Sequence, residues 1–234
     1  AEAGEAVRVA VATGNPALTL DALMIRAQAL TALGEATPED WQGVERAARE
    51  LDDWPKAALA LRMQVMRLLD DHAPDAAAPA ARLGAIAAAN AMPADLGWAE
   101  AVRAEIAMVA GRWDDAHTIA MRAVTTASRA KDISTVLRAW HVVIPMAAER
   151  ADDVRLSLAF YAYGRRAPGA SAYARLLDAA AAVRFAAAGL AQPVPVPPAD
   201  LLGAFDGAAA MPHWLAAVET IVDQWIAAGD FAAA

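Results

Sequence analysis

The chain has 234 residues, of which 58% are hydrophobic and 21% charged, which is enough apolar material for a sizeable core. About 29% of the residues are alanine, aromatic residues make up 6%, and β-branched residues rarely alternate with polar ones, so an all-α fold is expected. A net charge of −8 argues against binding of this segment to nucleic-acid phosphates, and the lack of cysteine excludes disulfides and thiolate metal sites.

The sequence also bears on location. The longest run without a charged residue, 185–199, contains four prolines, so no segment is expected to span a membrane. No basic stretch followed by an apolar core stands at the start of the chain, so no signal peptide is expected. These features predict a cytoplasmic protein.

Apolar, alanine-rich segments separated by short breaks predict pairs of helices. Pro16, Pro55, Pro74, Pro198 and Pro212 lie at or near predicted helix starts, where a missing N–H has no cost. In chain order, the expected pairs are 17–33 with 39–51, 55–71 with 75–90, 95–110 with 113–130, 133–150 with 152–166, 171–188 with 199–210, and 213–228 with a helix that begins at 230.

Four segments carry further expectations. Residues 1–14 are expected to complete the second helix of an earlier pair, and Pro145 should kink or split the helix that contains it. The proline-rich segment 190–198 predicts an extended, stiff connector between repeats. Because the sequence stops where another helix begins, residues 1–234 are expected to form one repeat domain cut from a longer protein.

The breaks between helices recur at a near-constant spacing. Gly111, Arg150, Gly189 and Gly229 are 39, 39 and 40 residues apart, and Gly34 precedes Gly111 by 77 residues, or about two periods. Such a period predicts antiparallel helix hairpins stacked in an α-solenoid of about six repeats.

Two of the breaks share a sequence pattern. The segments "AEIAMVAGRWDDAHTIAMRA" and "VDQWIAAGDFAAA" both contain A-G-[RD]-[WF]-x-x-A. This pattern resembles the turn of a tetratricopeptide repeat, in which a glycine ends the first helix, an aromatic residue opens the second and a small residue follows. The resemblance implies a right-handed superhelix in which the aromatic residue wedges between the helices. By this resemblance the turn residues are Gly34, Gly111, Trp113, Ala116, Gly189, Gly229 and Phe231.

The repeats differ from the tetratricopeptide consensus, because the period exceeds about 34 residues and the W-x2-L-G-x2-Y signature is absent or worn. Longer repeats of this kind, and the opening "EAVRVAVATGNPALTLDALMIRAQALTALG", are similar to the helical sensor region of LuxR-type and MalT-like bacterial transcriptional regulators. This resemblance implies a non-catalytic domain that binds a small-molecule effector or a protein partner in a concave groove. The ATPase and DNA-binding modules that it controls would lie outside this chain. A stand-alone scaffold for protein–protein interaction is the main alternative, and an all-α enzyme is a third.

The sequence contains no phosphate-binding loop, dinucleotide fingerprint or nucleophile elbow. Its four histidines, His72, His117, His141 and His213, occur singly and without the spacing of metal ligands. Pairs of aspartates recur at the predicted turns, where the helix dipole favours negative charge. No catalytic residue, metal or cofactor is therefore expected.

Candidate binding residues lie on the first helix of each pair. Arg26 and Arg103 stand eight residues before Gly34 and Gly111, and Arg62 stands eight residues before Asp70 at the corresponding break. They could form a ladder that binds an anionic ligand or an acidic peptide, or they could pair with acids of neighbouring repeats. Trp98 and Trp214 lie early in such helices and are further candidates for the groove.

Overall fold

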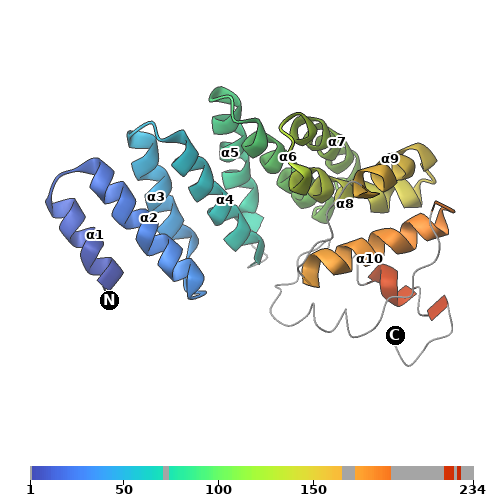
Figure 1. Cartoon of the computed structure of the whole chain (residues 1–234), viewed down its shortest axis with the longest axis horizontal. Coiled ribbons are helices and arrows are strands. Elements are labelled where there is room, and N and C mark those ends of the chain that lie inside the picture. The colour runs from blue at the N-terminus through green and yellow to red at the C-terminus, as the bar shows by residue number, and fades with distance from the viewer. Residues whose placement is uncertain (1, 71–73, 165–171, 191–218, 224–225, 228–234) are drawn as a thin grey trace. The chain divides into compact units, whose positions relative to one another are not determined.

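The computed structural model describes residues 2–70, 74–164, 172–190, 219–223 and 226–227, and in these ranges the chain is all-helical, with no strand (Figure 1). This confirms the all-α expectation. The helices are α1 (Glu2–Ala12), α2 (Pro16–Ala32), α3 (Pro38–Glu50), α4 (Trp54–Asp70), the 3-10 helix η1 (Pro74–Ala76), α5 (Ala77–Ala89), α6 (Pro93–Val109), α7 (Trp113–Arg129), α8 (Ile133–Glu149), α9 (Asp153–Gly164) and α10 (Ala172–Ala187).

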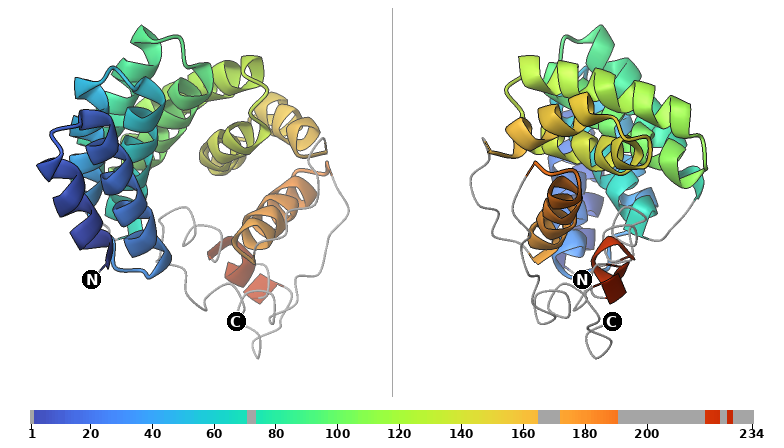
Figure 2. Two further views of the ribbon diagram at one scale, coloured as in Figure 1. Left: turned by 60° about the vertical axis from the view of Figure 1, so that its left-hand side comes forward. Right: turned by 90° about the vertical axis from the view of Figure 1, so that its right-hand side faces the viewer.

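The chain divides into two units, Ala1–Ala99 and Glu100–Ala234, and the division falls inside α6. In the first unit, each of α1 to α5 packs against its neighbours in sequence, and successive helices are antiparallel (Figure 2). In the second unit, α8 is the central helix, since it packs against α7, α9 and α10. Hairpins are therefore present in both units, whereas a superhelix of six repeats stays a prediction.

The turns that join the helices share one backbone conformation. Wherever the residues that follow an α-helix are described, the second of them has a positive φ, +71° at Gly111 and +52° at Ala151, for example. After all of these residues except Gly14, the next residue donates its N–H to a carbonyl five positions back, as Arg112 does to Ala107 and Asp152 to Ala147 at 2.9 and 2.8 Å. This is the Schellman motif. After Gly14, the N–H of Asn15 bonds instead to the Thr13 hydroxyl at 3.2 Å. The left-handed residues are Gly14, Gly34, Asp52, Ala91, Gly111, Lys131, Ala151 and Gly189. Where the turns at both ends of a helix are described, they are about 20 residues apart, which corresponds to one helix and its turn. Only half of these left-handed residues are glycine.

The residue that closes one helix also begins the next. Asp53, Asp132 and Asp152 each accept a hydrogen bond on a carboxylate oxygen from the N–H three residues later, at 3.1–3.2 Å. Each therefore satisfies a free donor at the following helix start while its own N–H bonds to the preceding helix. This double role explains why acids recur at the turns: two of the aspartate pairs supply helix caps.

Opposite substitutions at two equivalent left-handed turns, Ala151→Gly and Gly111→Ala, should change the stability of the chain in opposite directions. Ala151→Gly should raise the free energy of unfolding by roughly 0.5–1 kcal/mol, because glycine adopts a positive φ without steric cost. Gly111→Ala should lower it by a similar amount through backbone strain alone, since a Cβ at Gly111 meets no atom within 4 Å. Urea unfolding followed by circular dichroism measures both.

The control for this pair is Ala130→Gly. Ala130 caps α7 in an ordinary right-handed conformation with φ −76°, so glycine there should destabilise the chain or leave it unchanged. A gain in stability at Ala130 equal to the gain at Ala151 would contradict the role given to the left-handed turn.

The core of each unit is built largely from small side chains. In the second unit, a row of fully buried alanines lets the helices approach closely, and the rings of Trp140 and Phe185 are the largest groups among them. In the first unit, Trp41, Leu20 and Val44 pack with alanines of α2 to α4. The alanines that face inward from α7 are Ala116, Ala120, Ala123 and Ala127.

Of the two outcomes predicted for Pro145, a kink or a split of its helix, the split is wrong. Helix α8 runs without a break from Ile133 to Glu149, so Pro145 does not split it. A proline removes one hydrogen bond of the helix ladder. In α8, burial of the residues around Pro145 offsets the lost hydrogen bond. Those that are at most 3% exposed are Val142, Val143, Ile144, Met146 and Ala147. The connector at 190–198, apart from residue 190, and the helices expected at 199–210 and 213–218 lie outside the described residues, while residues 219–223 and 226–227 are helical.

Candidate functional site

The arginines singled out from the sequence divide into two paired residues and one exposed residue. Arg26 forms an ion pair with Asp40 at 3.0 Å, and Arg62 pairs with Asp95 at 2.8 Å. The Arg62 guanidinium also lies 5.1 Å from the centre of the Trp98 ring, a cation–π contact that accounts for both residues within the first unit. Arg103 belongs to the second unit, is exposed and makes no ion pair within the described ranges.

Arg26 and Arg62 therefore pair with acids of neighbouring helices, which was the alternative to an anion-binding ladder. Trp98 packs against a buried cluster that contains Leu61 and Leu83, and its ring also contacts Arg62. Trp214, Gly229 and Phe231 lie outside the described residues. The structure thus brings two of the five predicted groove residues, Arg62 and Trp98, into one contact.

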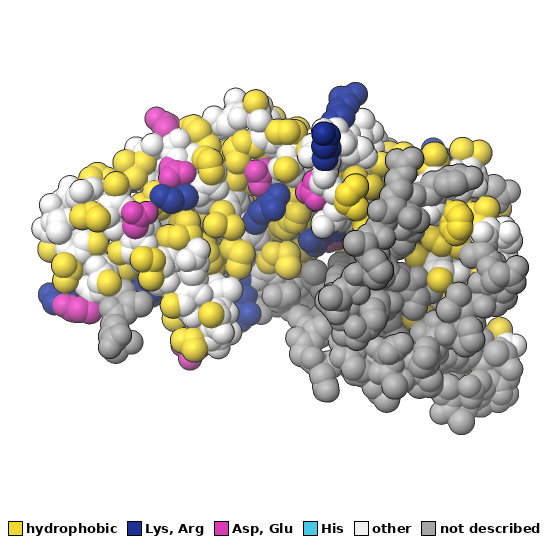
Figure 3. Space-filling model, in the orientation of Figure 1, with side chains coloured by type: hydrophobic (Ala, Val, Ile, Leu, Met, Phe, Trp, Pro, Cys, Tyr) yellow, Lys and Arg dark blue, Asp and Glu magenta, His cyan; other side chains and the backbone are white. Residues whose placement is uncertain are grey.

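Ion pairs between alternate helices recur within the units. Lys56 of α4 pairs with Asp21 of α2 at 3.2 Å, and Arg62 of α4 pairs with Asp95 of α6. On the surface of the first unit, basic and acidic side chains accordingly lie side by side among apolar ones (Figure 3). Most such pairs are partly exposed, and each contributes about 0–1 kcal/mol, so they help to align the helices rather than to stabilise the fold strongly.

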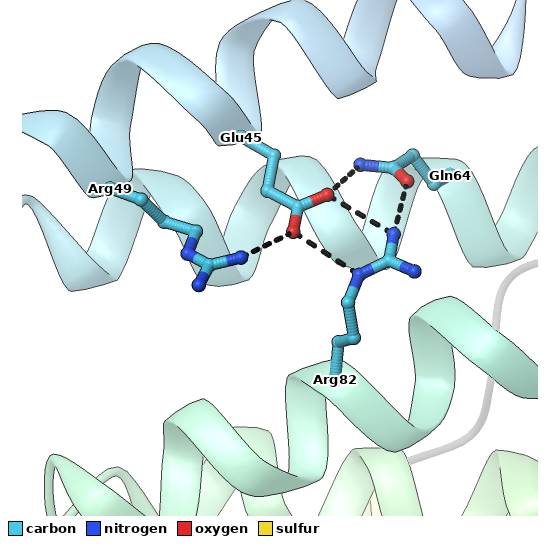
Figure 4. A network of polar contacts seen from close by, with 4 residues as sticks. All are labelled: Glu45, Arg49, Gln64 and Arg82. Atoms are coloured by element: carbon cyan, nitrogen blue, oxygen red, sulfur yellow. Dashed lines mark hydrogen bonds and ion pairs between the residues drawn. The ribbon is translucent and has the colours of Figure 1, made fainter.

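The most deeply buried polar cluster of the first unit joins α3, α4 and α5 (Figure 4). Glu45 of α3 is 6% exposed and Gln64 of α4 is 1% exposed. The Gln64 amide donates a hydrogen bond to the Glu45 carboxylate at 2.9 Å, and Arg82 of α5 donates to both Glu45 oxygens at 3.3 and 3.2 Å and to the Gln64 carbonyl at 3.2 Å. Arg49 lies 3.7 Å from the same carboxylate. A buried carboxylate needs such partners, because desolvation of an isolated charge is costly.

A hollow of about 630 Å³ opens on this cluster, and we refer to it as the arginine hollow. Three guanidiniums and two carboxylates line it, together with an amide and an indole ring. Its charge is therefore +1, in a chain whose net charge is −8. The lining residues are Gln42, Glu45, Arg46, Arg49, Glu50, Trp54 and Arg82.

Sequence reasoning missed this cluster. The residues are separated by 19 and 18 positions, and no local motif unites them. The sequence did contain one signal, because Glu45 and Arg82 are 37 residues apart, which is close to the repeat period. Only the packing of the three helices shows that the two side chains meet.

A second hollow, of about 690 Å³, surrounds Trp113 at the start of α7. The Trp113 ring is 40% exposed, so it lines this hollow and is not wedged between helices as the repeat resemblance implied. Arg150 closes one side through an ion pair with Asp114 at 2.8 Å. The difference has a simple cause: the neighbouring positions of α7 that face inward are alanines, which leave no room for a large ring at the interface.

His117 lies one turn into α7, near this second hollow, and titrates below its ordinary range. Burial lowers the pKa of His117, and repulsion from Arg155 and Arg150 lowers it further, while Asp152 and Asp114 offset part of the effect. Its Nε2 is buried and finds no hydrogen-bond partner among the described residues, in keeping with a neutral imidazole.

The lowered pKa of His117 predicts acid sensitivity. Below about pH 6.5 the unfolded chain takes up a proton at this position more readily than the folded chain, so the stability present above that pH is lost as the pH falls through the folded pKa. The melting temperature should therefore fall between pH 7 and pH 5, and His117→Gln should flatten this dependence. Equal pH dependence in the two proteins would exclude His117 as the cause.

Other chemistry is sparse in the part of the chain that the structure describes. No group of three or more histidine, aspartate or glutamate side chains there could hold a metal ion. None of the helices found there has the length and apolar character needed to cross a membrane. His72 and His213 lie outside the described residues.

Comparison with known proteins gives no relative. No protein-family model, no curated protein and no solved structure matches this chain. The function therefore has to be argued from the residues and their arrangement.

Proposed function

We propose that the chain is a non-catalytic recognition domain of tetratricopeptide-like hairpins, the sensor region of a bacterial signal-transduction ATPase that regulates transcription. It would bind a small-molecule effector or a protein partner. Occupancy would favour one arrangement of the helices over another, and this difference would reach the attached modules.

The observation that carries the proposal is the recurring unit of helix and left-handed turn. Five helices, α2, α4, α6, α7 and α8, have the same length of 17 residues, and the same turn ends them wherever the structure describes it. Repeats of equal helices contact mainly their neighbours and present long surfaces for binding. Ion pairs between helices support this interpretation, because Lys56–Asp21 and Arg62–Asp95 join helices of neighbouring hairpins in the described part of the chain.

A stand-alone scaffold for protein–protein interaction is the alternative. It shares the hairpins and differs in what flanks the domain. A phosphate-binding loop encoded upstream and a helix-turn-helix downstream would favour the sensor, and their absence from the parent gene would favour the scaffold.

A thermal-shift screen of metabolites against the purified chain tests the effector directly. A ligand at ten times its dissociation constant should raise the melting temperature by about 3–5 °C. If no compound shifts the melting temperature and affinity capture yields no specific protein partner, the recognition function is contradicted.

A further inference from the structure

We propose that the arginine hollow is the effector site, and that it binds a small organic anion in which a carboxylate or phosphate is joined to a planar group. This inference rests on the proposed function and adds the ligand class and the residues that recognise it. Arg46, Arg49 and Arg82 would hold the oxyanion, and the Trp54 ring would contact the planar group.

Shared charge is the first argument for the site. The Arg49 Nη1 and the Arg82 Nε both approach the same oxygen of Glu45, at 3.7 and 3.3 Å. One carboxylate thus faces two guanidiniums, and the three groups together retain one positive charge. The cluster holds its cations close to each other while neutralising only one of them, as an anion site requires.

The second argument is the fixed geometry of Arg82. Three hydrogen bonds through Nε and Nη2 hold its guanidinium to Glu45 and Gln64, while the side chain stays 42% exposed. Its Nη1 makes no hydrogen bond to any described residue and keeps its donors for a ligand (Figure 4). A guanidinium held in place binds a carboxylate or phosphate with less loss of side-chain entropy than a mobile one.

The third argument concerns the rim. Arg46 is exposed, lines the hollow and pairs with no acid in the described part of the chain. Trp54, the first residue of α4, is half-buried and presents part of its ring to the hollow. An indole beside guanidiniums is suited to a ligand with a planar apolar group next to its charge. Glu50, also on the rim, would disfavour ligands with several negative charges.

The test is an NMR titration of the purified chain with benzoate and phenyl phosphate, each compared with neutral benzyl alcohol. The Trp54 indole resonance, assigned with Trp54→Phe, should shift with a dissociation constant on the order of 1 mM for the better of the two anions, as expected for fragment-sized ligands. Benzyl alcohol should cause no comparable shift. Acetate and inorganic phosphate, tested in the same way, identify which oxyanion the site prefers.

Two exposed arginines give the decisive variant. Arg46→Gln with Arg49→Gln should raise the dissociation constant at least tenfold. Both positions are exposed, and the hydrogen bonds from Gln64 and Arg82 still satisfy the Glu45 carboxylate, so the fold should be retained. The matched control is Arg122→Gln with Arg129→Gln on the solvent-facing side of α7, which removes the same charge and should change the constant less than about twofold.

Three outcomes would overturn the site: equal binding of benzyl alcohol, an unchanged constant in the Arg46/Arg49 variant, or no Trp54 shift with any anion up to about 20 mM. The thermal-shift screen, repeated on the Arg46/Arg49 variant, separates this inference from the proposed function. A metabolite that stabilises wild type and variant equally would show that an effector binds elsewhere, which overturns the site and leaves the recognition function in place.

Discussion

Removal of the Glu105 carboxylate is expected to lower the free energy of unfolding by about 3 kcal/mol, because it takes away the charged acceptor of two hydrogen bonds from the largely buried Arg138 guanidinium. Arg138 of α8 donates two hydrogen bonds to Glu105 of α6, at 2.6 and 2.8 Å, and the two side chains are 19% and 5% exposed. Burial by itself would lower the pKa of Arg138, but attraction to Glu105 and the hydrogen bonds outweigh it and raise the pKa. Arg138 therefore stays charged and cannot escape by losing its proton. Urea unfolding of Glu105→Ala measures the cost.

The control for this prediction replaces both partners. Glu105→Met with Arg138→Met removes the charges together and keeps similar volume, so the double variant should recover most of the stability lost by the single one. A double variant less stable than Glu105→Ala would show that the pair itself, and not the isolated charge, accounts for the loss. A cost below about 1 kcal/mol for Glu105→Ala would show that Arg138 finds water or another partner.

The helices were the most predictable part of this fold, because proline and glycine mark their ends. Pro16 begins α2 and Pro55 is the second residue of α4, while Gly34, Gly111 and Gly189 follow helix ends in the left-handed conformation. Each of these residues acts through its own backbone, so the sequence alone is sufficient to place it.

Turns without glycine were harder to predict. Asp52, Ala91, Lys131 and Ala151 take the same left-handed conformation without the residue that favours it. The Schellman hydrogen bonds and the next helix hold them there, and these are properties of the hairpin rather than of the residue. The near-constant spacing of the breaks, which includes one at Arg150 without a glycine, was therefore a better guide than the glycines themselves.

The candidate site depended on information that the sequence does not display. Arginines chosen for their spacing on the first helices turned out to include paired ones, whereas Arg82 on a second helix completes the buried cluster. Spacing places residues on one face of a helix, but the partner of a charge is decided by which helices pack and how closely. In a core made of alanine, close approach allows side chains from three successive helices to meet, as Glu45, Gln64 and Arg82 do.

The alanine-rich core also makes the fold sensitive to its few large side chains. Trp140→Ala is expected to lower the free energy of unfolding by about 4 kcal/mol, because the surrounding alanines cannot extend to fill the cavity. Trp140 is 3% exposed and belongs to the buried cluster of the second unit, which also contains Met108, Val136 and Phe185. Urea unfolding followed by circular dichroism would measure the loss.

Trp140→Phe distinguishes lost volume from lost polarity. The Trp140 Nε1 is buried and finds no acceptor among the described residues, so the indole N–H is desolvated without compensation. Phenylalanine keeps most of the ring contacts and removes that donor, so this variant should cost only about 1 kcal/mol. If Trp140→Phe were as destabilising as Trp140→Ala, the N–H would have to be hydrogen-bonded, for example to an internal water. The core would then contain a polar contact, and the stability of the second unit would not come from packing alone.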